Sequence, residues 1–379
     1  MQRQAILHRK NQSRSAAPPR FPQSIFFAVD GSDLRLPYDP TNDFSLIRNA
    51  EGQKQYNLAH LNAMFDLMSK AYVDVTMQGK KGMNEHKALI SMIDRSNILG
   101  KVIVLMDRGY ESFNNIAHLQ EKKWNFIIRA KESYGMISNL QLPNSEEFDV
   151  DTTLTLTRRQ TKETLALLSA YPERYRWIQP HTTFDYIALK DPTMYDLRFR
   201  VVRFRISGGC YETVYTNLDS ETFPIGTIKE LYRLRWGIET SFRELKYTIG
   251  LSCLHGKKTD FLLQEVFARL ILYNYASLIA RKIPVPQEKQ INFSVAILSN
   301  LSAVTFVSPL ALRMLSSFSC CLSSGLSNAN SNALPSRVSL SKSSRRAVEF
   351  TCLSISSWKS LSDRSKQRMI ASSHILLNS

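Results

Sequence analysis

Three acidic residues stand where they could hold metal ions for phosphodiester chemistry. Asp30 ends the apolar run SIFFAVD and Asp107 ends the apolar run KVIVLMD, so each is predicted to lie at the end of a buried strand. Glu239 lies in a segment whose apolar residues recur with helical spacing. Three carboxylates on rigid elements can converge on two divalent ions, which activate an attacking oxygen and stabilise the leaving one. Mg²⁺ is the expected cofactor because it prefers oxygen ligands, and Mn²⁺ could substitute for it.

Basic and phenolic side chains accompany Glu239 on the same predicted helix. If that helix is continuous, Tyr232, Arg235 and Lys246 share with Glu239 an arc of about 60°. Arg235 and Lys246, together with Arg108 after the second aspartate, could position a phosphate backbone, and Tyr232 could donate to a phosphate. The pattern therefore predicts a site for DNA beside the carboxylates.

A core-facing stripe lies next to this polar arc and would anchor the helix. Its members are Leu231, Leu234, Ile238, Phe242, Leu245 and Ile249. Simpler interpretations exist for the polar residues. Arg235 and Glu239 form an i, i+4 pair, which on a solvated face contributes about 0.3 to 0.5 kcal/mol. Asp30 and Asp107 each begin an Asp-Gly or Asp-x-Gly sequence, which is common in turns where strands stop.

The elements that must position these residues divide the chain into five parts. Residues 1–24 are predicted to be a basic flexible arm, because they are polar and carry three prolines. Residues 25–139 read as β-β-β-α-β-α-β, with strands at 24–30, 61–68, 71–78, 101–107 and 125–131 and a helix capped by Asn84. Residues 140–220 alternate Thr and apolar residues and are predicted to be a β-rich insertion.

Two helices are expected in the next part, residues 221–297. The first begins at the capping box formed by Thr227 and Glu230 and runs to about Thr248. The second begins near Asp260 as N-cap and runs to about Arg281, before two prolines. Residues 298–379 form a Ser-rich basic tail that is predicted to be disordered or out of frame. The fold class is therefore α/β, a mixed sheet with flanking helices, carrying a β-rich insertion.

Composition agrees with a nucleic-acid partner. The chain has 49 Lys and Arg against 33 Asp and Glu, a net charge of +16, which favours a polyanion. Its five cysteines lack a Cys-x-x-Cys spacing, so a disulfide framework or structural zinc site is not indicated. The start lacks the apolar region of a signal peptide, and the segment 261–279 contains charges that are costly in a bilayer. A cytoplasmic location without membrane contact is expected.

The residues also carry a family resemblance. The spacing Tyr232-x2-Arg235-x3-Glu239-x6-Lys246 resembles the Tyr-Arg-Glu-Lys signature of DDE transposases of the insertion-sequence-4 type. The blocks AVDGSDLRLP, VLMDRGYES, TNLDSETFP and YRLRWGIETSFRELKYTIGL stand in that family's order, and the resemblance covers residues 25–297.

This resemblance implies an RNase H-like catalytic core and names the roles of the site residues. Asp30, Asp107 and Glu239 would bind the metal ions, and Tyr232, Arg235 and Lys246 would contact phosphates near the transposon end; Arg108 is a further candidate for DNA contact. The function implied is strand cleavage at terminal inverted repeats followed by strand transfer into target DNA, in a synaptic complex that could contain a homodimer.

Both ends of the chain depart from that pattern. Only 29 residues precede Asp30, where the family carries a helical DNA-binding region, and the Ser-rich tract replaces the family's helical ending. We expect a copy that is truncated or frame-disrupted. An inactive remnant that only binds DNA and a generic metal-dependent nuclease are therefore alternatives to an active transposase.

Overall fold

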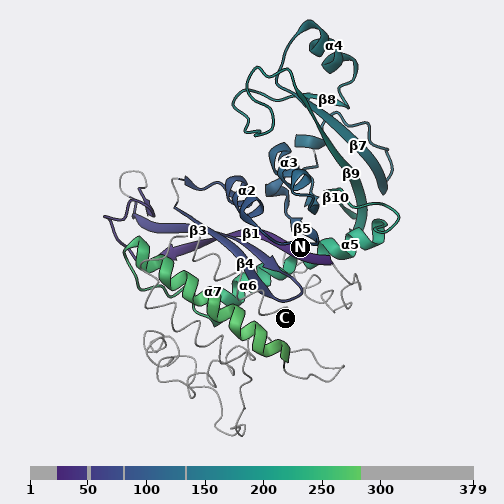
Figure 1. The fold of residues 1–379 in the computed structure, drawn as a ribbon. Coiled ribbons are helices and arrows are strands. Elements are labelled where there is room, and N and C mark those ends of the chain that lie inside the picture. Colours follow the sequence, from purple (N-terminus) through teal and green to yellow (C-terminus); the bar gives the residue numbers. More distant parts are fainter. Residues whose placement is uncertain (1–23, 49–52, 80–81, 133–134, 283–379) are drawn as a thin grey trace. The chain divides into compact units, whose positions relative to one another are not determined.

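A computed structural model describes residues 24–48, 53–79, 82–132 and 135–282 of the chain. The expected arm up to residue 23, the segment 283–297 and the Ser-rich tail at 298–379 lie outside these ranges. Contacts divide the chain into two compact units: unit 1 is Met1–Phe26 with Ser96–Trp236, and unit 2 is Phe27–Arg95 with Gly237–Ser379. Figure 1 traces the elements of both along the chain.

Unit 2 contains an antiparallel group of strands. β3 (Tyr56–Asp66) pairs with β1 (Ser24–Leu36, in unit 2 from its fourth residue) along one edge, and with β2 (Leu46–Ile47) and β4 (Ala71–Gly79) along the other. The predicted antiparallel start of three strands is confirmed, with β2 as an addition. The prediction that the first strand ends at Asp30 is wrong, because β1 continues to Leu36 in unbroken register with β3.

Helices cover both faces of these strands. Alternate residues of β1 and β3, such as Ala28, Leu34, Leu61 and Phe65, pack in one core with α6 (Trp236–Arg243) and α7 (Thr259–Lys282). The residues of opposite parity turn toward α2 (Glu85–Arg95), which lies on the other side of the strands in Figure 1. Asn84 accepts a hydrogen bond from the Lys87 amide (2.9 Å), so the predicted N-cap of this helix is confirmed.

Unit 1 contains a mixed sheet with the strand order β5-β6-β10-β9-β7-β8. The strands β5 and β6 are parallel, as are β7 and β8, and the remaining neighbours are antiparallel. The bounds are β5 (Lys101–Met106), β6 (Asn125–Arg129), β7 (Phe148–Thr157), β8 (Tyr175–Trp177), β9 (Met194–Ser207) and β10 (Cys210–Thr216). The β-rich character predicted for residues 140–220 is confirmed by β7, β8, β9 and β10, whereas the domain boundaries stay a prediction.

Short helices join the strands of unit 1. They are η2 (Arg108–Tyr110), α3 (Phe113–Glu121), η3 (Gly135–Ile137), α4 (Lys162–Ala170) and α5 (Ile225–Leu234). The sequence did not predict α4, which lies within the β-rich stretch. Its N-terminus has a capping box in which Thr161 and Thr164 each accept from the other's backbone amide. Local capping therefore starts a helix within a stretch whose overall composition favours strands.

The single helix predicted from Thr227 to Thr248 is wrong. Instead, α5 begins at Ile225 with Pro224 as N-cap, so the predicted capping box does not start it. The helix ends before Arg235, whose amide bonds to the Tyr232 carbonyl (3.1 Å), a tighter i to i−3 turn. The chain then continues as α6 and as η4 (Glu244–Thr248), a π-helical turn. The second predicted helix is confirmed as α7, which begins one residue before the predicted cap Asp260.

The mixed α/β fold class that the sequence predicted is confirmed, with helices flanking the strands. None of the helices in the described part of the chain has both the length and the apolar character that a membrane crossing requires. The segment 261–279 belongs to α7, whose buried residues complete the core of unit 2.

Candidate active site

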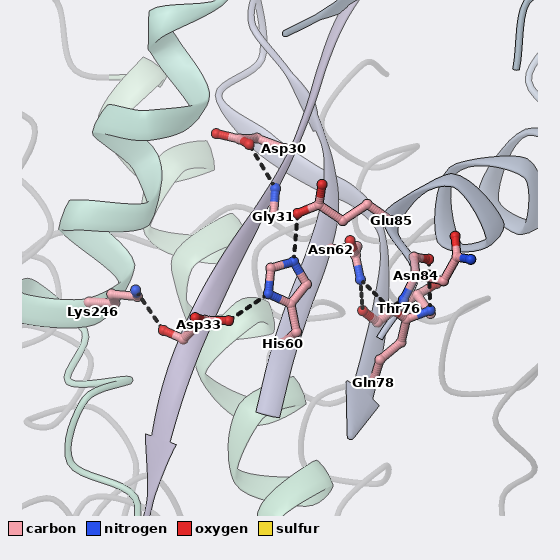
Figure 2. Close-up of polar contacts among 10 residues, drawn as sticks. All are labelled: Asp30, Gly31, Asp33, His60, Asn62, Thr76, Gln78, Asn84, Glu85 and Lys246. Carbon is pink, nitrogen blue, oxygen red and sulfur yellow. Dashed lines mark hydrogen bonds and ion pairs between the residues drawn. The ribbon is translucent and has the colours of Figure 1, made fainter. Parts of the chain in front are cut away.

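Asp30 lies in the middle of β1, where it pairs with Ala63 of β3. Phe27, Ala28 and Val29 before it are buried, and Asp30 itself is half-buried. Its Oδ1 accepts the Gly31 amide (2.8 Å), and Figure 2 shows the other carboxylate oxygen directed away from that amide. The strand thus fixes the carboxylate at the edge of a buried apolar segment, although not at a strand end.

Asp107 directly follows β5, as predicted, and is half-buried. It is the N-cap of η2, and its Oδ1 accepts the Arg108 amide (2.7 Å). The turn interpretation of this aspartate is therefore correct as far as its local geometry goes. Arg108 is exposed. Asp30 and Asp107 thus share one feature: the backbone amide of the next residue donates to the carboxylate and orients it.

Tyr232 and Arg235 belong to unit 1 and are both buried, with 4% and 5% of their surface exposed. The Arg235 guanidinium carbon lies 5.7 Å from the centre of the Tyr232 ring and 5.2 Å from that of Trp236. Neither residue therefore lies on an exposed face, and the continuous helix on which the predicted polar arc depends is interrupted beside them. The reason is the turn at Arg235, which ends α5 and places the guanidinium between aromatic rings.

The Tyr232 hydroxyl is buried without a hydrogen-bond partner among the described residues. Burial raises the pKa of Tyr232; Arg235 opposes this rise, and the negative charge of Asp107 adds to it. The hydroxyl therefore stays protonated and within the electrostatic reach of Asp107. A buried O–H without an acceptor costs about 1 to 3 kcal/mol, so an arriving acceptor at this place would be favoured.

Glu239 and Lys246 belong to unit 2 and are half-buried. Glu239 lies in the first turn of α6, and Lys246 lies in the π-helical turn η4. The Lys246 ammonium donates to the backbone carbonyl of Asp33 in β1 (2.8 Å; Figure 2). Burial lowers the pKa of Lys246, and the charge of Asp33 partly offsets that effect.

The predicted core-facing stripe is confirmed and explains how these side chains are held. Leu231, Ile238, Phe242, Leu245 and Ile249 are buried, and Leu234 is half-buried. The last four buried members pack into the core of unit 2. The predicted apolar contacts therefore persist in spite of the breaks in the helix.

Buried polar contacts attach the same segment to its neighbours. Asn274 of α7 bonds to both the amide and the carbonyl of Tyr72 in β4 (2.7 and 2.8 Å). The Tyr72 hydroxyl meets Ser241 of α6 (2.9 Å), and Tyr273 donates to Glu244 at the start of η4 (2.8 Å). The bonds of Ser241 and Glu244 thus attach α6 and the π-helical turn that carries Lys246 to β4 and α7.

A cluster of titratable side chains that the sequence did not predict lies close to Asp30. His60 of β3 lies between Asp33 of β1 and Glu85 of α2, with distances of 2.7 Å from Nδ1 to Asp33 Oδ1 and 2.9 Å from Nε2 to Glu85 Oε1 (Figure 2). A signal was present, since His60 directly precedes the strand predicted at 61–68 and interrupts the apolar run LAHLNAMF.

The three predicted metal ligands are distributed over the two units. Asp30 and Glu239 lie in unit 2 and Asp107 lies in unit 1. In neither unit do the described residues form a group of three or more His, Cys, Asp or Glu side chains that could hold a metal ion. The donors themselves fit a divalent ion, because they are carboxylates and the orientation of two of them is fixed by a backbone amide.

Comparison with known proteins gives the family. Residues 22–275 match the family model of the transposase DDE domain, and this range includes all seven predicted site residues. Among solved structures, the chain is similar to the piggyBac transposase in a synaptic complex with hairpin DNA, with 12% identity, a TM-score of 0.37 and coverage of 84% of this chain and 59% of that one. The chain therefore spans about 59% of that transposase's length. A search of curated proteins gave no significant match.

The match covers well over half of the chain. Domains of this type are nuclease and transposase enzymes that act on DNA and use divalent metal ions. The chain belongs to the family of transposases with a DDE domain.

Proposed function

We propose that the chain is a transposase of the insertion-sequence-4 type, which cleaves DNA at terminal inverted repeats and transfers the 3′ end to target DNA. The observation that carries this proposal is the order of the sequence blocks, from the one around Asp30 to the one around Lys246, inside the matched range 22–275. Water would be the first nucleophile and the DNA hydroxyl the second, in a two-metal mechanism.

Asp30, Asp107 and Glu239 are the proposed metal ligands, with Mg²⁺ as the physiological ion and Mn²⁺ as a substitute. A bound ion would supply charge for the developing oxyanions, and the protein would orient the carboxylates. Support comes from the oriented Oδ1 atoms of the two aspartates and from the placement of Glu239 on a helix anchored in the core.

Tyr232, Arg235, Lys246 and Arg108 are the proposed DNA contacts. The unpaired hydroxyl of Tyr232 near Asp107 supports a role as donor to a phosphate oxygen, and the exposure of Arg108 supports a contact with the backbone. Lys246→Ala should weaken DNA binding at all sequences and flatten its salt dependence by about one phosphate contact.

The decisive experiment is Mn²⁺-dependent cleavage of duplex DNA that carries the flanking inverted repeats. Asp30→Asn, Asp107→Asn and Glu239→Gln should each abolish cleavage while DNA binding remains. Asp43→Asn is the matched control, because this unit 2 aspartate is exposed and pairs only loosely with Arg48 (3.5 Å). Full cleavage by any of the three site variants would refute the assigned ligands.

The same assay separates the two alternatives. Cleavage of DNA without preference for the repeats would indicate a generic metal-dependent nuclease. Binding without cleavage in Mg²⁺ or Mn²⁺ would indicate a remnant that only binds DNA. Light scattering of the protein with and without repeat DNA tests the proposed homodimer in a synaptic complex.

A further inference from the structure

His60 occupies a protected position against the strand that carries Asp30. It pairs directly with Asp33 across β1 and β3, and its side chain is only 9% exposed. Each ring nitrogen faces a carboxylate oxygen, on Asp33 and on Glu85 (Figure 2). A neutral imidazole has one N–H, so only the imidazolium can donate to both carboxylates.

The charge state of His60 agrees with this geometry. Burial lowers the pKa of His60, but the hydrogen bonds and negative charges of Glu85 and Asp33 outweigh burial, so the net pKa is raised. The bond to His60 lowers the pKa of Glu85. With His60 protonated, the cluster is a charge-assisted bridge between β1, β3 and α2, and such bonds are about twice as strong as neutral hydrogen bonds.

Glu85 is itself held in place by the start of α2. Two hydrogen bonds join Asn84 to Gln78 of β4: the Asn84 amide donates to Gln78 Oε1 (3.0 Å), and Gln78 Nε2 donates to the Asn84 carbonyl (3.1 Å). Gln78 in turn accepts from Asn62 of β3 (3.2 Å; Figure 2). The Glu85 carboxylate therefore approaches His60 from a helix end fixed on two strands.

The bridge rests directly on the backbone next to Asp30. A Cβ atom at residue 31 would lie 2.6 Å from Glu85 Oε1 and 2.9 Å from His60 Cε1, and closer still to His60 Nε2. Only glycine leaves room for this approach. The Gly31 amide is also the donor that orients the Asp30 carboxylate (2.8 Å). The bridge and the carboxylate thus contact the same peptide segment.

We propose that His60, held between Asp33 and Glu85, is a positioning residue that fixes the β1 backbone at Gly31 and thereby the Asp30 carboxylate for metal binding. This inference rests on the proposed function, in which Asp30 is a metal ligand. His60 does not touch the metal or the DNA. It acts through the strand, as partners that orient metal ligands do.

The test measures metal binding by the full chain without DNA. His60→Gln carries its donors on a single nitrogen, has an acceptor oxygen as its other polar atom, and removes the positive charge. Mn²⁺ affinity, followed by electron paramagnetic resonance, should fall by about tenfold or more, the usual cost of losing a group that orients a ligand. In the cleavage assay, the Mn²⁺ concentration for half-maximal rate should rise by the same factor.

His118→Gln is the matched control for a merely structural effect. His118 is also 9% exposed and pairs with a half-exposed aspartate, Asp185 (3.0 Å), but it lies on α3 in unit 1. Both variants should lower the melting temperature, and only His60→Gln should weaken Mn²⁺ binding. If a folded His60→Gln protein binds Mn²⁺ as tightly as the wild type, the inference is overturned.

Two more variants complete the design. If His60→Gln does not fold, Glu85→Gln replaces it, since it keeps the size of the side chain and removes one charge of the bridge; unchanged Mn²⁺ affinity in that variant overturns the inference. Asp30→Asn is measured alongside. Undiminished Mn²⁺ binding by Asp30→Asn refutes the proposed function and this inference with it, whereas loss in Asp30→Asn without loss in the folded bridge variants refutes this inference alone.

Discussion

Replacing Gly31 by alanine adds only one methyl group, yet it should strongly destabilise unit 2. The new Cβ would lie 2.9 Å from His60 Cε1 and 2.6 Å from Glu85 Oε1, whereas ordinary contacts of a Cβ begin at 3.4 Å. Both groups must therefore move, and the 2.9 Å bond between them is stretched or lost. Loss of a charge-assisted bond costs about 1.5 to 3 kcal/mol. Overpacking adds about 1 to 3 kcal/mol.

The expected decrease in the free energy of unfolding is thus about 2 to 5 kcal/mol, since the two costs partly replace each other. Urea unfolding of the full chain with hydrogen exchange read on peptides of β1 and β3 reports this change within unit 2. Gly226→Ala is the control, because Gly226 is an exposed residue of α5 with no atom within 4 Å of an added Cβ. Alanine there should be neutral or stabilising by up to about 1 kcal/mol.

A double-mutant cycle separates the steric cause from a general intolerance of β1 to change. In the His60→Ala background the obstructing ring is absent, so Gly31→Ala should cost much less than in the wild type. A cost of less than about 0.5 kcal/mol in the wild type, or an equal cost in both backgrounds, would refute the claim that His60 and Glu85 rest on Gly31.

Three further outcomes are expected. Asn274→Ala should lower the free energy of unfolding by about 2 to 4 kcal/mol, because the buried amide and carbonyl of Tyr72 lose their partner; urea unfolding measures it. Arg200→Met should lower it by about 3 to 5 kcal/mol, because Arg200 is 3% exposed and its ion pair with Asp149 is broken; calorimetry tests this. Unit 2 should lose stability with rising pH: the contribution of His60, whose folded pKa is raised, is complete below the ordinary imidazole pKa of about 6.5 and disappears as pH passes the folded value. Hydrogen exchange in β3 should show this loss in the wild type and not in His60→Gln.

The sequence predicted the elements whose signal is local and periodic. The apolar runs before Asp107 and before the β3-β4 turn are strands, and the apolar stripe from Leu231 to Ile249 is buried as its spacing predicts. Burial of one face is a strong constraint, because a shift of one residue would move every apolar side chain to the wrong side. The C-terminal end of β1 could not be predicted from apolar periodicity. Asp30 reads as a turn residue, but pairing with β3 carries the strand past it to Leu36.

The helix that carries Glu239 shows what periodicity cannot reveal. A wheel with a constant 100° per residue assumes one uninterrupted helix, whereas the chain tightens at Arg235 and widens into a π-helical turn at Glu244. At the first change Arg235 contacts the rings of its near neighbours Tyr232 and Trp236, and at the second a tertiary bond runs from Tyr273 to Glu244. The residues of the apolar stripe stay on one side because they are buried together in the core. The polar arc has no such constraint, so its members differ: Tyr232 and Arg235 are buried, and Glu239 and Lys246 are half-buried.

The position of Lys246 shows how the π-helical turn affects the candidate site. Its ammonium reaches the carbonyl of Asp33 because η4 turns it toward β1. Asp33 therefore has two partners on different elements: its carbonyl receives Lys246 and its carboxylate receives His60. Lys246 of η4 and His60 of β3 therefore hold the strand segment from Asp30 to Asp33 at the same residue, Asp33 (Figure 2). A substitution of either residue changes the restraints on the same four residues, 30 to 33. The effects of Lys246→Ala and His60→Gln on Mn²⁺ affinity should therefore be non-additive, although neither residue is a proposed metal ligand.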